Sequence, residues 1–240
     1  MASQSLDSIS AVLPAFNEEE NIEAAATRMA EALRSLPLAD WEVIIVDDGS
    51  VDNTGAIADR LASEDSRIRV FHHQPNLGYA EALKTGFGNS KHKLFFFTDS
   101  DNQFDVREIS RLIPLIRDVD IVCGFRIYRF DPLTRLVISW VFNLVVRIMF
   151  RIKVRDIDCA FKLFRREVFD LVEIKSKKFF VNAEVLAKAK YYGFKMCEVG
   201  VRHYPRPAGR STVRASHVPS TLAELARIWI EIHSKPRRKG

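Results

Sequence analysis

The sequence predicts an α/β fold with a mostly parallel sheet flanked by helices, and three observations support this. Over the first 125 residues, short apolar segments alternate with segments whose apolar residues recur every three or four positions. The strand-like segments are apolar almost throughout, which is typical of parallel strands buried on both faces. Polar and acidic residues directly follow several of them, at the edge where parallel sheets bind ligands.

The expected elements follow in regular order. A strand at residues 8–13 precedes a helix from about Glu19 to Leu36, with apolar residues at helical spacing. The elements expected next are a strand at 41–46, a helix at 52–62, a strand at 67–71, a helix at 78–87, a strand at 93–98, a helix at 106–117 and a strand at 119–123. This alternation predicts a sheet with helices on both faces.

Charge is distributed unevenly along the 240 residues, a length that suits one large α/β domain. Residues 1–120 carry 11 Lys and Arg against 21 Asp and Glu, and residues 121–240 carry 25 against 10. An acidic half suits cations, whereas a basic half suits phosphates or an anionic membrane. We expect no nucleic-acid partner, because no helix-turn-helix, finger or ribonucleoprotein signature accompanies the basic residues.

The predicted location is cytoplasmic. The N-terminus lacks a basic segment followed by an apolar core, and no stretch reaches the roughly 20 apolar residues of a spanning helix. The three cysteines are widely spaced and odd in number, which indicates reduced thiols rather than a disulfide or zinc framework.

Three polar clusters carry the candidate chemistry. Residues 14–18 follow the first predicted strand, 47–50 the second and 99–103 the fourth, so all three are expected at one cleft. Each Asp alone has an alternative role as a helix cap or turn residue. Together, however, so many carboxylates are costly unless a cation or sugar hydroxyls balance them. Oxygen ligands such as Asp101 and Gln103 suit magnesium or manganese bridging a diphosphate. Glycine-rich phosphate or dinucleotide motifs do not follow these strands.

These motifs resemble those of family 2 glycosyltransferases of the GT-A (Rossmann-like) fold, and within that family the dolichol-phosphate and polyprenyl-phosphate hexose synthases. The resemblance covers nearly the whole chain in order, at residues 12–18, 46–54, 76–80, 99–101, 124–126, 155–164 and 206–211. Two departures concern Ala80 with Glu81, and Ala160, where relatives often carry glycine.

The resemblance implies a role for each matching residue. The donor would contact Pro14, Ala15, Asn17, Glu18, Asp48 and Asp99. Mg²⁺ or Mn²⁺ on the diphosphate would be held by Asp101 and Gln103. The catalytic residues would be Asp99, Asp101 and Arg126, and phosphate, including that of the acceptor, would be bound by Arg126, Arg206, Arg210 and Ser211.

Two amphipathic segments lie in the basic half. Residues 133–152 and 219–233 combine apolar and basic residues with a tryptophan each, which is typical of helices at a membrane surface. The alternative is that both cover the sheet or a second copy. We expect a catalytic domain at 1–212 that includes the first segment, and a C-terminal helix with a basic tail at 213–240. Relatives often continue into transmembrane helices, so peripheral attachment or a membrane-bound subunit is expected here.

The function implied is inverting transfer of a hexose from a nucleotide sugar, of the GDP-mannose or UDP-glucose type, to a polyprenyl or dolichyl phosphate at the cytoplasmic face of a membrane. An acceptor phosphate is largely ionised near neutral pH and needs no strong base. If the acceptor were a sugar or protein hydroxyl, candidate bases would be Asp156, Asp158 and Glu184, although structural roles are favoured for them. A non-catalytic nucleotide-sugar-binding subunit is the second alternative.

Overall fold

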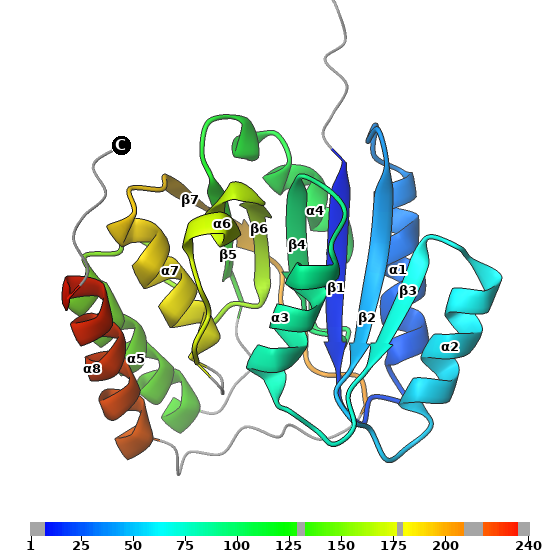
Figure 1. The fold of residues 1–240 in the computed structure, drawn as a ribbon, viewed down its shortest axis with the longest axis horizontal. Helices are drawn as coiled ribbons and strands as arrows, with labels where there is room; N and C mark the ends of the chain where they lie inside the picture. Colours follow the sequence, from blue (N-terminus) through cyan, green and yellow to red (C-terminus); the bar gives the residue numbers. More distant parts are fainter. Residues whose placement is uncertain (1–7, 129–132, 177–179, 209–217, 235–240) are drawn as a thin grey trace, which may run out of the picture.

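The computed structural model describes residues 8–128, 133–176, 180–208 and 218–234, which form one sheet flanked by helices (Figure 1). The sheet has seven strands in the order β3-β2-β1-β4-β6-β5-β7. Neighbouring strands are parallel except where β6 meets β4 and β5, so the predicted mostly parallel α/β sheet is confirmed. The strands are β1 (Ile9–Ala15), β2 (Trp41–Asp47), β3 (Ile68–His72), β4 (Leu94–Thr98), β5 (Ile121–Arg126), β6 (Phe161–Arg165) and β7 (Met196–Val201).

The helices agree with most of the expected segments. They are α1 (Ile22–Arg34), α2 (Thr54–Glu64), α3 (Tyr79–Asn89), α4 (Ile109–Leu112), α5 (Leu133–Phe150), α6 (Glu167–Leu171), α7 (Val181–Tyr191) and α8 (Val218–Ser234). Strands β1, β2 and β4 are buried along their whole length, as uniformly apolar segments predict. Helix α3 approaches β1 so closely that a Cβ atom on Gly86 would lie 2.4 Å from Val12 Cγ1.

The prediction of a single helix over residues 106–117 is wrong. The structure has a short 3₁₀ turn at Val106–Glu108, the four-residue α4, and a second 3₁₀ turn at Leu115–Arg117. Pro114 explains the break, because proline has no backbone N–H and its ring clashes with the carbonyl of the residue four positions earlier. The apolar periodicity is genuine, since Ile109, Leu112 and Ile116 are all buried.

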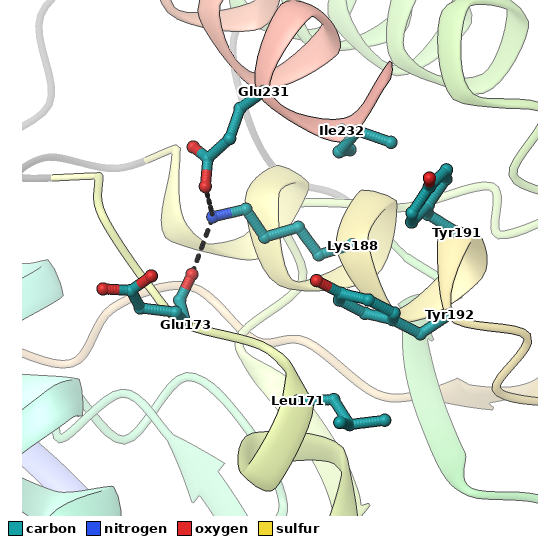
Figure 2. A pocket seen from close by; sticks show the side chains of 7 residues that line it. All are labelled: Leu171, Glu173, Lys188, Tyr191, Tyr192, Glu231 and Ile232. Carbon is teal, nitrogen blue, oxygen red and sulfur yellow. Dashed lines mark hydrogen bonds and ion pairs between the residues drawn. The ribbon is translucent and has the colours of Figure 1, made fainter. Parts of the chain in front are cut away.

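Helices α5, α7 and α8 form a block at one edge of the molecule, with α8 packed on both others (Figure 1). A buried ion pair joins α7 to α8. Lys188 Nζ lies 2.6 Å from Glu184 Oε1, one turn earlier on α7. It also lies 3.1 Å from Glu231 Oε1 on α8 and donates to the Glu173 carbonyl oxygen (Figure 2). The pocket here encloses only about 10 Å³, the space of about one water molecule, so it is a joint between helices and no ligand site.

The outer face of α5 is apolar and uncovered. Trp140 is 64% exposed, and the exposed apolar side chains around it on α5 are Leu133, Val137, Val141, Leu144 and Ile148. The opposite face packs inward through Val146 and Phe150. Asn143, a polar residue within this apolar segment, is also buried. Over the part of the chain that the structure describes, no helix combines the length and apolarity needed to cross a membrane. The predicted domain boundary near residue 212 lies outside the described residues.

Candidate active site

The three polar clusters meet at the carboxyl ends of β1, β2 and β4, which are neighbours in the sheet. Ser100 Oγ, after β4, donates to the Pro14 carbonyl oxygen at 2.8 Å. The backbone N–H of Asn17, after β1, donates to Ser50 Oγ at 2.9 Å, and that of Glu18 donates to Thr54 Oγ1 at 2.8 Å. These contacts bring the three segments together at one edge of the sheet, as their positions after neighbouring strands predict.

Negative charge accumulates at this edge. Burial raises the pKa of the Asp99 carboxyl to about 7, and the neighbouring Asp101 charge adds to the effect. Burial likewise raises the pKa of Asp101, to which the Glu18 charge also contributes. Tyr79 donates from its hydroxyl to Asp99 Oδ1 at 3.1 Å. Burial raises the pKa of Tyr79, and the charges of Asp99, Asp101 and Asp158 reinforce it, so Asp158 belongs to the same acidic environment.

The residues present fit a divalent cation. Among the described residues, no group of three or more His, Cys, Asp and Glu side chains could enclose a metal ion. Magnesium, however, is commonly held by one or two carboxylates together with substrate phosphates rather than by a cage of protein ligands. The Gln103 amide nitrogen Nε2 donates to the Tyr204 carbonyl oxygen at 3.0 Å, so its Oε1 is the atom that could coordinate. A cation at Asp101 would also offset the repulsion among the carboxylates.

Asp48 is anchored inside the protein instead of standing free in the cleft. Its carboxylate accepts hydrogen bonds from the backbone N–H groups of Leu77 and Gly78, at 2.9 and 2.8 Å, and from the Asn76 side chain at 3.0 Å. His73 Nδ1 lies 2.7 Å from the same group. Asp48 therefore holds the loop that leads into α3, a role that the sequence did not predict beside its expected contact with the nucleoside.

The other residues expected at the donor lie along the first strand and the turn after it. Pro14 and Ala15 are the buried last residues of β1. Asn17 is exposed, adopts a left-handed backbone with φ of 54°, and accepts from the Val51 N–H at 2.9 Å. Such a conformation is unusual outside glycine, and asparagine tolerates it best. The side chain of Asn17 therefore fixes the turn after β1 to the loop after β2.

Arg126 ends β5 in a bidentate contact with Asp156. Its Nε and Nη2 donate to the two carboxylate oxygens at 2.8 and 2.7 Å. Burial opposes the charge of the guanidinium, yet the bonds and charge of Asp156 raise the pKa of Arg126 above its usual value. Asp156, one of the candidate bases, is therefore committed to Arg126. Glu184, another candidate, is fully buried on α7 and bonded to Lys188, which gives it a structural role.

Arg206 lies against the acidic cluster. Its Nη2 donates to Glu18 Oε1, and its Nη1 is 3.9 Å from Asp101 Oδ2. The segment that carries it is tied to the residues after β4, since the Tyr204 N–H donates to the Gln103 carbonyl oxygen at 2.7 Å. The structure thus brings Arg206, expected at the acceptor phosphate, beside Glu18 and Asp101. Arg210 and Ser211 lie outside the described residues.

Fold and site together define a glycosyltransferase of the GT-A type. Residues 10–172 match the family model described as "Glycosyl transferase family 2", and the chain belongs to that family. The glycosyltransferase class predicted from the motifs is thereby confirmed.

The chain is similar to several individual proteins at 33% sequence identity or below. The chain is 33% identical to "Glycosyltransferase AglD" of Haloferax volcanii, in an alignment covering 95% of this chain but only 38% of that protein. It is 28% identical to "Polyprenol monophosphomannose synthase" of Mycolicibacterium smegmatis, over 90% of this chain and 84% of that protein. Among solved structures, glucosyl-3-phosphoglycerate synthase from Mycobacterium tuberculosis, in complex with Mn²⁺, uridine diphosphate and phosphoglyceric acid, aligns with a TM-score of 0.71 at 19% identity. That alignment covers 97% of this chain and 80% of the other, and it supports the fold.

Proposed function

We propose that this protein transfers a hexose, with inversion, from a nucleotide sugar of the GDP-mannose or UDP-glucose type to a polyprenyl or dolichyl phosphate at a membrane surface. One observation carries the proposal. A carboxylate cluster at Asp99 and Asp101 and a buried cation at Arg126 share one edge of the sheet, close enough for Arg126 to lower the pKa of Asp99 against burial and the Asp101 charge, which both raise it. Transfer of a sugar between phosphate groups requires carboxylates that can hold a metal ion and a positive charge that can bind phosphate.

The chemistry assigned to the side chains is mainly electrostatic. Asp101 and Gln103 would hold Mg²⁺ or Mn²⁺, which when bound supplies positive charge to the departing diphosphate. The two hydrogen bonds to Asp156 fix the orientation of the Arg126 guanidinium. A guanidinium is suited to two parallel hydrogen bonds with phosphate. No general base is needed for an acceptor phosphate, whose second pKa is about 6. This agrees with the structural partners of Asp156 and Glu184.

The exposed apolar face of α5 supports a membrane location. A polyprenyl chain stays in the bilayer because exposing each methylene to water costs about 0.8 kcal/mol. An enzyme that uses its phosphate must therefore reach the headgroup plane, which requires an apolar surface and positive charge. Trp140 and its neighbours offer the first, and the exposed side chains of Arg147, Arg151 and Lys153 offer the second. The cytoplasmic face, the membrane-bound subunit and a basic C-terminal helix unit after residue 212 stay predictions.

The relatives support the acceptor class more than the sugar. The mycobacterial protein is named for a polyprenol phosphate product, and the sequence motifs point the same way. This chain spans only 38% of the length of AglD. The activity of the whole AglD protein therefore does not define the activity of this chain. Donor base and sugar depend on the shape of the loops around Asn17 and Asn76.

The test is a transfer assay with purified protein, labelled nucleotide sugars, Mg²⁺ or Mn²⁺, and polyprenyl phosphate in vesicles. We expect a labelled lipid that forms only with the phosphorylated acceptor, with free polyprenol as the control. Product on a sugar or protein hydroxyl without lipid phosphate would support the hydroxyl-acceptor alternative. Tight donor binding without transfer or hydrolysis would indicate a non-catalytic subunit.

A further inference from the structure

A lysine with no accessible surface lies in the middle of the sheet. Lys162 stands on β6, between Phe97 of β4 and Cys123 of β5 in the register of the sheet. Lysine is almost never fully buried unless it is paired, because taking an ammonium group out of water is expensive. Its presence between the buried residues Phe161 and Leu163 of that strand therefore calls for a compensating set of contacts.

Those contacts bind the loop that precedes β6. Lys162 Nζ donates to the carbonyl oxygens of Ile157, at 3.0 Å, and of Cys159. A third acceptor is the side chain of Asn182 on α7, at 3.2 Å. An ammonium group has three hydrogens, so these three acceptors account for all of them. The buried lysine thus ties residues 157–159 to the first turn of α7.

A second buried polar side chain holds the same loop from the other side. Asn143 on α5 accepts the backbone N–H of Ile157 at its Oδ1, at 2.7 Å. Its own Nδ2 donates to the Ser139 carbonyl oxygen one turn earlier, at 2.8 Å, which fixes the orientation of the amide. Ile157 is therefore gripped at its N–H by α5 and at its carbonyl oxygen by β6.

The residue next to this double grip is Asp156. Its carboxylate receives the two guanidinium bonds of Arg126 and, at 3.2 Å, the Arg126 backbone N–H. A carboxylate that makes three directed contacts can orient the guanidinium only if its own backbone is fixed. The contacts on Ile157 and Cys159 provide that fixed backbone.

We propose that Lys162 and Asn143 are positioning residues, which hold the loop at 156–159 so that Asp156 presents Arg126 to the phosphate chemistry. This rests on the proposed function for what Arg126 does, and on the contacts above for how it is held. Neither Lys162 nor Asn143 is assigned to touch substrate. The loop joins the apolar helix α5, the sheet and α7 at a single point beside the site.

The first test separates positioning from binding. In Lys162→Met and in Asn143→Ala, we expect kcat for sugar transfer to fall roughly 10- to 100-fold, because small misplacements of a catalytic group cost about this much. The Kd of the nucleoside diphosphate should stay within about twofold, since the loop after β1 and the Asp48 loop are unchanged. Val168→Ala, a buried apolar truncation on α6, is the control for general loss of packing and should leave kcat unchanged. An equal loss in kcat for Val168→Ala, or an unchanged kcat in both Lys162→Met and Asn143→Ala, would overturn the proposal.

A double-mutant cycle gives the sharper readout. If Lys162 acts through Asp156, adding Lys162→Met to Asp156→Asn should lower kcat little beyond the loss in Asp156→Asn alone. Multiplicative losses would mean that the two residues act independently, contrary to the proposal. Should Lys162→Met fail to fold, the same cycle with Asn143→Ala decides, because that variant removes one accepted hydrogen bond from α5.

Hydrogen exchange tests whether these hydrogen bonds hold the loop at 156–159, and it does not depend on an activity assay. The peptide covering residues 155–160 should exchange at least roughly tenfold faster in both loop variants than in the wild type and in Val168→Ala. Unchanged exchange would refute the grip, whatever the kinetics. If the wild type transferred no sugar to any acceptor, the proposed function would fall, and the exchange data alone would decide between a held and a free loop.

Discussion

Replacing Asp48 with asparagine should destabilise the folded protein by about 3 kcal/mol, since a hydrogen bond to a charged group contributes about 1.5–3 kcal/mol. The carboxylate accepts on both oxygens. Oδ1 faces the Leu77 N–H and His73, and Oδ2 faces Asn76 and the Gly78 N–H. An asparagine keeps one acceptor oxygen and points its NH₂ group at donors on the other side, whichever way it is turned. At least two charge-assisted hydrogen bonds are lost, and at about 1.5 kcal/mol each they give the expected loss of about 3 kcal/mol.

The assay is urea unfolding at fixed pH, with donor affinity measured on the same samples. Asp59→Asn is a matched control, because Asp59 is 63% exposed and bonds only the ring of His72 among the contacts described. Exposed pairs contribute about 0–1 kcal/mol, so the control should unfold close to the wild type. The reasoning is refuted if Asp48→Asn unfolds like the control and loses only donor affinity. Asp48 would then serve the nucleoside, as its motif alone suggests.

Three further outcomes are expected. Asp101→Ala should abolish metal-dependent donor binding and transfer while unfolding nearly as the wild type does, which calorimetry with Mn²⁺ can check; full activity in chelator would exclude the metal. Trp140→Glu should release the protein from anionic vesicles at low salt and leave donor Kd unchanged, whereas Leu115→Glu, at another exposed apolar position, should sediment like the wild type. Burial of Glu184 favours its neutral form, but Lys188 and nearby backbone amides lower its pKa below the ordinary 4.5. Glu184→Gln should therefore be less stable than the wild type above pH 5, a difference that narrows as acid protonates the wild-type carboxylate; a constant difference at all pH values would contradict this.

The first five strands were predictable because most of them are apolar segments that alternate with segments of helical periodicity. β6 and β7 were not predicted. β7 mixes Glu198 and Gly200 with apolar residues and is only half-buried over its first four positions. β6 carries Lys162 at its second position and Arg165 at its end, so the sequence of a mostly buried strand looks polar. Lys162 was the available signal, because a lysine between Phe161 and Leu163 needs compensating partners if the segment is buried.

The candidate site divides in the same way. Asp99, Asp101 and Glu18 were found because acidic residues after strands share an edge of a parallel sheet. Side-chain partners across large sequence distances could not be found from spacing. Tyr79 with Asp99 and Arg126 with Asp156 come from different elements, and their pairing depends on how helices and loops pack. The Arg206 contact with Glu18 spans nearly the whole chain.

The reversed direction of β6 has a consequence for where function can be engineered. In a parallel sheet, only the residues that leave a strand arrive at the carboxyl edge, and the loops that enter the strands lie at the far end. A strand that runs the other way exchanges the two ends, so the loop entering β6 is delivered beside the ends of β4 and β5. A mutational library confined to the exits of the parallel strands would omit Asp156 and Asp158. For this architecture, variation aimed at the reaction should include the entrance of the one antiparallel strand in the middle of the sheet.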